Sequence, residues 1–229
     1  MAMAVQWMCC PLSFPGNFGS VGKRGQVAMV PKALPHRRVW PVTPALVAVT
    51  SFGKQEEDDA QNEEELKRDE HFMRLALEQA ELAAAAGEVP VGAIMVDDEG
   101  QILAAAHNRT ETDCDPTAHA EMICIRKAST VARGWRLLNA SMYVTLEPCP
   151  MCAGAILQSR VRRVVYGARN PLLGADGSWV DLLRPQSTSS LQQIGRPHPF
   201  HAQLSVSHGV LESCCGDIMR DFFRAQRQS

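Results

Sequence analysis

The chain has 229 residues, a formal net charge of −2 at pH 7 and a hydrophobic fraction of 45%, which suit one folded domain with an appendage. No run approaches the roughly 20 apolar residues of a membrane helix, so a soluble protein without a membrane partner is expected. From His71 onward 16 acidic and 15 basic residues nearly cancel. Binding to a nucleic acid would therefore need a local basic patch rather than the charge of the whole domain.

The first 55 residues differ from the rest in composition. No Asp or Glu precedes Glu56, whereas Lys, Arg, Ser, Pro and Gly all occur there. An acid-free, mildly basic segment of this kind predicts an organelle transit peptide over 1–55 that is removed from the mature protein. An ordinary disordered tail is the alternative interpretation.

The acidic segment 56–70 predicts a solvated linker or the polar start of a helix. The folded domain is expected over 71–229. Its first element is a helix over 71–86, because apolar residues recur there at helical spacing and Gly87 follows.

Strand patterns follow this helix. An apolar run over 89–96, the turn sequence DDEG and a second run over 101–107 predict two paired strands. Beyond them helices are expected over 118–131, 150–158 and 211–227, strands over 142–146, 161–166 and 204–206, and a turn-rich loop over 170–177. This alternation predicts an α/β fold with a central sheet covered by helices.

Two cysteines three positions apart, Cys149 and Cys152, stand where a predicted strand meets a predicted helix. Thiolate is the form of cysteine that binds zinc, and the positive end of a helix dipole lowers the thiol pKa. Alone, the pair is compatible with a metal site, a redox pair or half of a structural zinc site. A second pair with this spacing is missing, because Cys214 and Cys215 are adjacent.

His119 and Glu121 favour a metal site over the other two interpretations of the cysteine pair. With Pro148 and the two cysteines they complete H-x-E…P-C-x-x-C, the signature of zinc-dependent nucleobase deaminases. Three protein ligands leave tetrahedral zinc one position for a water whose pKa falls to about 7, and Glu121 is the candidate proton shuttle. Residues two apart on an ideal helix point in nearly opposite directions, so His119 and Glu121 can share a site only in the first turn.

Six regions resemble the bacterial-type tRNA adenosine deaminases, which convert adenosine to inosine at the first anticodon position, chiefly of an arginine tRNA. They are EVPVGAIMV (88–96), HNR (107–109), DPTAHAEM (115–122), LEPCPMCAGAI (146–156), VVYGARN with LLGADGS (164–178) and DFFRAQR (221–227). The similarity covers about 71–227. Cytosine, guanine and dCMP deaminases share the zinc motifs with this group. The motifs DPTAHAE and DFFR narrow the resemblance to the tRNA adenosine deaminases.

The resemblance implies a cytidine-deaminase-like, three-layer α/β/α fold with a central mixed sheet. It implies one Zn²⁺ per chain, and a homodimer in which both subunits touch the anticodon stem-loop of a tRNA. The implied zinc ligands are His119, Cys149 and Cys152, with Glu121 as proton shuttle. The implied substrate contacts are Asn108, Ala120, Asn170, Phe223 and Arg224. A turn residue at the end of a strand is the alternative for Asn108.

The terminal helix has an apolar face and an opposite stripe of Arg220, Arg224 and Arg227. Phe223 falls beside this stripe, where it could stack on an RNA base while guanidinium groups hold phosphates. A solvated amphipathic helix with one extra half-buried Phe is the alternative. Three further arginines could extend the patch or merely flank a helix end: Arg160, Arg162 and Arg163.

Asn170 stands where many bacterial members carry Asp. An Asp near the substrate backbone could accept a hydrogen bond from a ribose 2′-OH, the group that separates RNA from DNA. The exchange to Asn therefore predicts weaker discrimination against deoxyadenosine. A residue that only forms the turn before Pro171 is the alternative.

A bacterial-type enzyme behind a transit-peptide-like segment indicates a chloroplast, with the mitochondrion as the alternative. Two other functions stay open. One is a zinc deaminase of a free base or nucleotide such as guanine, cytosine or dCMP. The other is a zinc-stabilised RNA-binding module without catalysis, in which Glu121 would be dispensable.

Overall fold

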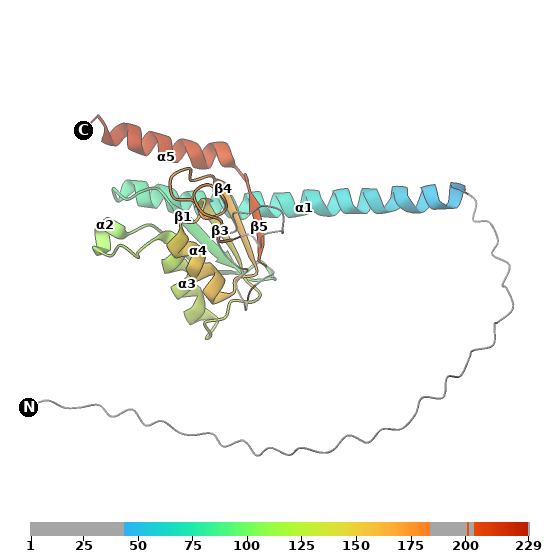
Figure 1. Ribbon diagram of the computed structural model, residues 1–229, viewed down its shortest axis with the longest axis horizontal. Coiled ribbons are helices and arrows are strands. Elements are labelled where there is room, and N and C mark those ends of the chain that lie inside the picture. Colours follow the sequence, from blue (N-terminus) through green and yellow to red (C-terminus); the bar gives the residue numbers. More distant parts are fainter. Residues whose placement is uncertain (1–43, 184–200, 202–203, 229) are drawn as a thin grey trace, which may run out of the picture. The chain divides into compact units, whose positions relative to one another are not determined.

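The computed structural model describes residues 44–183, 201 and 204–228, with side chains from residue 59 onward (Figure 1). Residues 1–43 of the expected transit peptide lie outside the described residues. Among the helices of the described part, none combines the length and apolar character needed to cross a membrane.

A sheet of five strands is the centre of the domain. Its strand order is β2-β1-β3-β4-β5, with bounds Gly92–Val96 for β1, Ile102–His107 for β2, Ser141–Leu146 for β3, Arg163–Ala168 for β4 and Ser205–His208 for β5. β1 is antiparallel to β2 and β3, whereas β3, β4 and β5 are parallel. The expected mixed sheet is therefore confirmed, and each expected strand is present with ends shifted by at most three residues.

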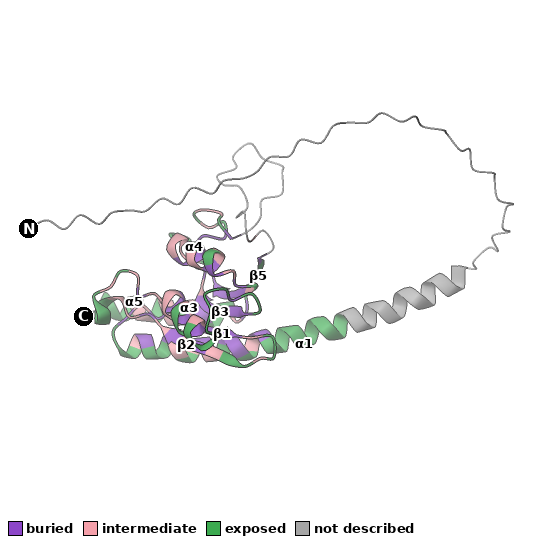
Figure 2. Cartoon of the chain, turned by 90° about the horizontal axis from the view of Figure 1, so that it is seen from below, coloured by how far each residue is buried: buried purple, intermediate pink, exposed green. Residues whose placement is uncertain are grey.

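Helices cover both faces of the sheet and make three layers (Figure 1). Their bounds are Pro44–Ala85 for α1, Ala120–Val131 for α3, Pro150–Ser159 for α4 and Glu212–Gln226 for α5. Alternate strand residues point to opposite faces: Met95 and Met142 pack in the core with α3 and α4, while Ile94 and Tyr143 pack in the core with α1. Figure 2 shows the buried residues gathered between these layers.

The start of α1 differs from the expectation. The helix was expected to begin at His71, but it is continuous from Pro44, so the acidic segment 56–70 is helical and is not a linker. Neither Pro nor Gly occurs between Gln55 and Ala86, and Glu, Gln, Lys and Ala favour helices. Residues 59–68 are all exposed, as Figure 2 shows in green, so this half of α1 is the polar start of the helix.

Asp69, at the end of the acidic segment, belongs to the core. It is 3% exposed and accepts two hydrogen bonds from the guanidinium of Arg163, at 2.7 and 2.8 Å. The hydroxyl of Tyr143 donates a further bond to it, at 2.9 Å. These contacts tie α1 to β3 and β4, since a buried charge is stable only when it is paired and hydrogen-bonded.

A short helix, α2 (Thr110–Asp113), was not expected from the sequence. It is one turn long, too short for a periodic pattern to reveal it. Cys114 ends it in the left-handed conformation, with φ of 49°.

Gly92 sets the distance between α1 and β1. A Cβ placed there would overlap with the carbonyl oxygen of Ala76 and lie 2.5 Å from the backbone nitrogen of Ala80. The clash would be with helix backbone, which cannot move aside as a flexible side chain can. We therefore expect Gly92→Ala to lower the free energy of unfolding by about 1–3 kcal/mol, the usual cost of overpacking.

Urea unfolding monitored by circular dichroism measures this cost. The matched control is Gly154→Ala on α4, where a Cβ would meet no atom within 4 Å. Replacing that helical glycine should stabilise the protein by roughly 0.5–1 kcal/mol. Equal effects of the two substitutions would show that the α1–β1 contact is looser than described.

Candidate active site with a zinc ligand set

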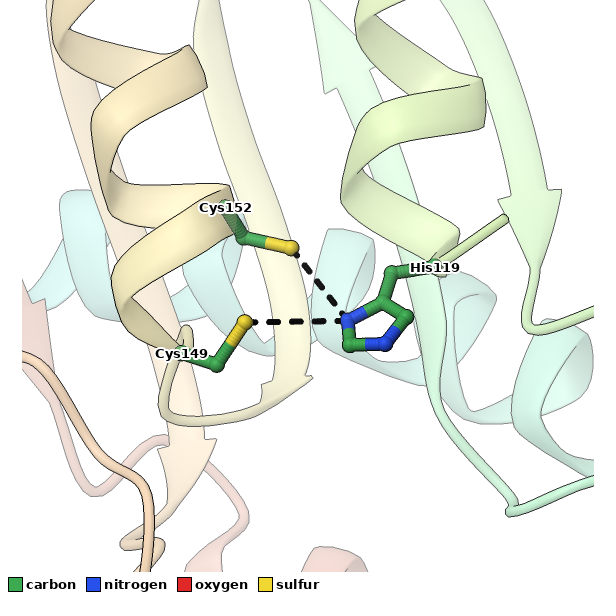
Figure 3. Close-up of side chains that lie close together, drawn as sticks. All are labelled: His119, Cys149 and Cys152. Atoms are coloured by element: carbon green, nitrogen blue, oxygen red, sulfur yellow. Dashed lines mark hydrogen bonds between the residues drawn. The ribbon is translucent and has the colours of Figure 1, made fainter. Parts of the chain in front are cut away.

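The N-termini of α3 and α4 lie at the edge of the sheet where β3 ends (Figure 3). His119 is the N-cap of α3 and Cys149 is the N-cap of α4, and both have extended backbones. Pro150 occupies the first position of α4, where its fixed φ suits a helix and its missing N–H costs nothing. Because an N-cap residue lies outside the helical geometry, its side chain can turn across the end of the helix.

Three side chains converge between these helix ends. Figure 3 shows the sulfurs of Cys149 and Cys152 directed at the ring of His119. The Nδ1 atom of His119 lies 3.7 Å from Sγ of Cys149 and 3.5 Å from Sγ of Cys152. Across a tetrahedral angle, typical zinc–nitrogen and zinc–sulfur bonds place the two ligand atoms about 3.6 Å apart. The donor set and its spacing therefore fit one zinc ion.

This is the one group of three or more His, Cys, Asp or Glu residues, within the part of the chain that the structure describes, whose ligand atoms could hold a metal together. The expected ligands His119, Cys149 and Cys152 are thus brought together, all within 4.8 Å of one another. Two thiolates and one imidazole are the ligand types that zinc prefers, and three ligands leave one position open.

The two thiols shift each other's pKa in opposite directions. Hydrogen bonding to Cys152 and to His119 lowers the pKa of the Cys149 thiol to about 4. Hydrogen bonding to Cys149 and burial raise the pKa of Cys152. Hydrogen bonding to Cys149 also raises the pKa of His119. Zinc binds thiolates and a neutral imidazole, so the affinity for zinc is expected to fall as the pH falls.

Glu121 lies in the first turn of α3, as the sequence required for a site shared with His119. Both residues line the same cleft although they are two apart. The reason is that His119 precedes the helix, so the 100° step between helical residues does not apply to it. Glu121 is 4% exposed, and burial raises the pKa of its carboxyl.

The cleft above these residues has a volume of about 870 Å³, within the range of ligand-binding pockets. It opens where β2, β3 and β4 end and where β1 begins. Its walls include Asn108 from the end of β2, Asn170 from the loop after β4 and Phe223 from α5. Exposed apolar side chains form part of its rim, with Leu172 80% and Phe223 41% exposed.

The loop after β4 is held by a buried carboxylate that the sequence interpretation left without a role. Glu147, which is 1% exposed, accepts hydrogen bonds from the backbone N–H groups of Asn170 and Asp176, at 3.0 and 2.8 Å, and from Ser178 Oγ. A Cβ at Gly174 would overlap with this carboxylate. Glu147 thereby fixes the cleft wall formed by 170–178.

Within that wall Asn170 is a turn residue. Its Oδ1 accepts a hydrogen bond from the N–H of Leu173, at 3.1 Å, and its carbonyl accepts one from Gly174, at 2.8 Å. These bonds support the turn interpretation. The first bond also engages Oδ1, the oxygen by which Asn170 could accept a hydrogen bond from a substrate.

The other expected substrate contacts have mixed outcomes. Phe223 and Arg220 line the cleft, whereas Arg224 does not. Both arginines pair with an aspartate three residues earlier, Arg220 with Asp217 and Arg224 with Asp221. The side chain of Ala120 is fully buried, so only its backbone N–H, at the first position of α3, could face a substrate.

Of the two interpretations of Arg160, Arg162 and Arg163, the structure supports residues that flank a helix end over an extension of the basic patch. Arg162 pairs with Asp98 and Arg163 pairs with Asp69, each through an N–O contact of 2.6–2.7 Å. Arg160 ends α4 and lies over Trp135, with 5.4 Å between guanidinium carbon and ring centroid. All three stand at the far end of α4 and the start of β4, away from the cleft, because β4 runs from them toward it. Arg169, which lines the cleft, was missed.

The comparison with known families agrees with this geometry. The cytidine and deoxycytidylate deaminase zinc-binding region matches residues 66–168, a span that contains Glu121 and all three ligands. Fold and site thus define a zinc-binding deaminase domain of this class. Zinc is its cofactor, held by the His119, Cys149 and Cys152 set.

Individual relatives give the family. The chloroplastic tRNA(adenine(34)) deaminase of Arabidopsis thaliana is 50% identical over 178 residues, which are 76% of this chain and 14% of that protein. The tRNA-specific adenosine deaminase of Bacillus subtilis (strain 168) is 43% identical over 163 residues, which are 71% of this chain and 93% of that protein. The chain belongs to the family of tRNA-specific adenosine deaminases.

A solved structure supports the same assignment. It comes from a study of A-to-I editing by tRNA:A34 deaminases at the wobble position of transfer RNA. Its identity to this chain is 42% and the TM-score is 0.54, over 65% of this chain and 98% of that one. The chain spans only a small part, 14%, of the Arabidopsis protein.

We expect about one zinc per purified chain, and its loss in Cys149→Ala and in Cys152→Ala, since each substitution leaves only two ligands. Elemental analysis by mass spectrometry measures the zinc content. Cys214→Ala is the matched control: this cysteine is exposed and lies on α5, so zinc should be retained. A normal zinc content in both ligand variants would overturn the site.

Proposed function

We propose that this protein hydrolyses adenosine to inosine at the first anticodon position of a tRNA, with an arginine tRNA that carries the anticodon ACG as the first candidate. The observation that carries the proposal is the cleft itself. It joins the zinc ligand set and the buried Glu121 on one side to the exposed Phe223 and Arg220 on the other. Catalytic groups and groups suited to single-stranded RNA thus share one opening.

The reaction converts adenosine and water into inosine and ammonia. When zinc is bound, it lowers the pKa of the attacking water. Glu121 would accept a proton from this water as the water adds to C6 of the adenine, and would deliver it to N1. It would then take the remaining proton of this water from the new hydroxyl on C6, which becomes the carbonyl of inosine, and pass it to the amine, which leaves as ammonia. The buried position of Glu121 suits this task because bulk water does not compete for the proton.

The shape of the cleft favours an RNA substrate over a free base. A site for a free base buries most of the surface of its ligand, whereas this cleft has exposed apolar side chains at its mouth, Leu172 and Phe223 among them. Splayed-out bases of an anticodon loop can stack on such side chains. A zinc-stabilised RNA-binding module would leave the buried carboxylate of Glu121 without a reason to line the site.

The location of the protein in the cell and its oligomeric state are further proposals. A chloroplast location is supported by the chloroplastic relative from Arabidopsis thaliana and by the acid-free composition of residues 1–55, which suits a transit peptide. A homodimer that binds the anticodon stem-loop with both subunits is supported by the family resemblance. Sedimentation velocity of the domain, with and without a stem-loop RNA, measures the assembly.

The direct assay incubates the purified protein with the arginine tRNA and, separately, with guanine, cytosine and dCMP. Inosine in the tRNA together with released ammonia is the expected result. Ammonia released only from a free base or nucleotide would establish the alternative enzyme. No product from any of them would favour the module without catalysis.

Glu121→Gln should keep zinc and the free energy of unfolding but lower kcat by roughly 10²- to 10⁴-fold, because a Gln cannot take and return a proton. Zinc analysis, thermal unfolding and single-turnover assays on the tRNA test this together. A kcat near the wild-type value would contradict the assignment of Glu121 as proton shuttle.

Phe223→Ala should weaken the affinity for an anticodon stem-loop roughly tenfold or more, because base–aromatic stacking contributes about 1–3 kcal/mol. The matched control is Phe222→Ala, since Phe222 is half-buried and does not line the cleft. This control should lower the melting temperature more than it lowers the affinity. Fluorescence anisotropy gives the affinities, and the reverse pattern would mean that α5 faces the RNA differently.

The Asn170 hypothesis predicts a difference between the protein and its Asn170→Asp variant. Each would be assayed on a stem-loop RNA and on the same hairpin with deoxyadenosine at the edited position. The RNA-to-deoxy ratio of rates should be higher in the Asp variant, since a carboxylate accepts more strongly from a 2′-OH. An equal ratio would leave Asn170 with only its role in the turn.

A further inference from the structure

Two almost fully buried carboxylates line the cleft without taking part in the chemistry described above. They are Glu88 and Glu147, each 1% exposed. The hydrogen bonds of Glu147 go to the loop after β4. Glu88 differs because one of its partners is Asn108, a side chain that itself lines the cleft.

Glu88 accepts hydrogen bonds from three residues of the described structure. The backbone N–H of Thr112 donates to its Oε1 at 2.7 Å, and the backbone N–H of Glu111 donates to its Oε2 at 3.2 Å. The third donor is Nδ2 of Asn108, at 3.4 Å from Oε2. Burial alone would raise the pKa of Glu88, but these hydrogen bonds outweigh it and lower the pKa, so the carboxylate is ionised at neutral pH.

The ionised carboxylate decides which way the amide of Asn108 faces. A carboxylate can only accept hydrogen bonds, so the amide atom beside it must be the nitrogen. The same Nδ2 also donates to Oγ1 of Thr110, at 3.3 Å. Both amide hydrogens are therefore directed at protein atoms.

The amide oxygen is left for the cleft. Among the described residues no donor reaches Oδ1 of Asn108, and this oxygen is not one of the buried atoms without a partner. Since Asn108 lines the cleft, Oδ1 opens into it. The site thus presents a hydrogen-bond acceptor at this position, whereas a free Asn could present either end of its amide.

We propose that Glu88 is a positioning residue, which holds Asn108 so that Oδ1 faces the cleft and selects a hydrogen-bond donor of the substrate. In adenosine the donors are the ribose hydroxyls and the amine that leaves. The identity of the substrate rests on the proposed function, but the orientation of Asn108 does not.

Replacing Glu88 by Gln would reverse this selection with little change of volume. A Gln has one side-chain oxygen, which the backbone N–H of Thr112 would take. Its amide nitrogen would then face the nitrogen of Asn108, donor against donor. Asn108 relieves the conflict by turning its amide over, which directs Nδ2 into the cleft in place of Oδ1.

The test compares Glu88→Gln with the double variant Glu88→Gln/Asn108→Asp. In the double variant the new amide donates to one oxygen of the new carboxylate, and the other oxygen again offers an acceptor to the cleft. Both variants weaken the cap of α2 alike, so a purely structural role of Glu88 predicts that the double variant is no more active than Glu88→Gln. kcat and KM are measured on the stem-loop RNA, with zinc content and melting temperature for each protein.

We expect Glu88→Gln to lower kcat/KM roughly 10- to 100-fold, the loss typical of an unmatched buried hydrogen-bonding group, and the double variant to recover most of it. The control is Asp69→Asn, another buried carboxylate that lies at the opposite end of β4. It should lower the melting temperature and leave kcat/KM unchanged. A double variant no more active than Glu88→Gln, with zinc and fold intact, would overturn the proposal.

A second readout needs no activity. In the wild-type protein the side-chain NH₂ of Asn108 should exchange slowly with solvent, because Glu88 and Thr110 hold its hydrogens, and in Glu88→Gln it should exchange quickly. NMR of a ¹⁵N-labelled protein measures this, with Asn108→Asp identifying the signal. Equal exchange rates refute the positioning role whatever the substrate is, whereas a wild-type protein inactive on tRNA refutes only the proposed function.

Discussion

The meeting of two helix N-termini at one edge of the sheet is the constraint on which the site depends. α3 and α4 cover the same face of the sheet, and small or slender residues of both helices, Ala120, Cys124 and Ala153 among them, are fully buried in the core there. This arrangement brings the N-caps His119 and Cys149 within 3.7 Å of each other. The positive ends of both helix dipoles point into the same space and favour the thiolates that zinc requires.

Buried carboxylates define the walls around this centre. Glu88 holds α2 and Asn108 through one carboxylate, and Glu147 holds the loop that contains Asn170 through another. In each case the carboxylate, rather than another backbone group, accepts hydrogen bonds from backbone N–H groups. Buried N–H groups cannot be left unpaired. The rigid zinc site and the substrate-facing loops are thus positioned by the same few strand ends.

The sequence could predict the elements and the zinc ligands because both have local signals. Periodicity located the strands, and H-x-E with P-C-x-x-C needs only short spacings. The partners of Asp69 and Glu88 lie 20 or more residues away, and no local pattern encodes such contacts. The same distance explains why the sequence left the role of Arg163 open, since its charge is taken up by Asp69 on α1. Acidic residues within apolar stretches, as in EVPVGA and TLEPC, were the available signal for Glu88 and Glu147.

The central claim is a zinc centre with two sulfur ligands and one imidazole, and a remaining position for the reaction. X-ray absorption at the zinc edge of the purified protein tests it most directly, because sulfur and nitrogen ligands scatter differently and lie at about 2.3 and 2.0 Å. The account predicts two sulfur neighbours with two lighter ones, of which one is the nitrogen of His119. Four sulfur neighbours would mark a closed structural site and would contradict the account.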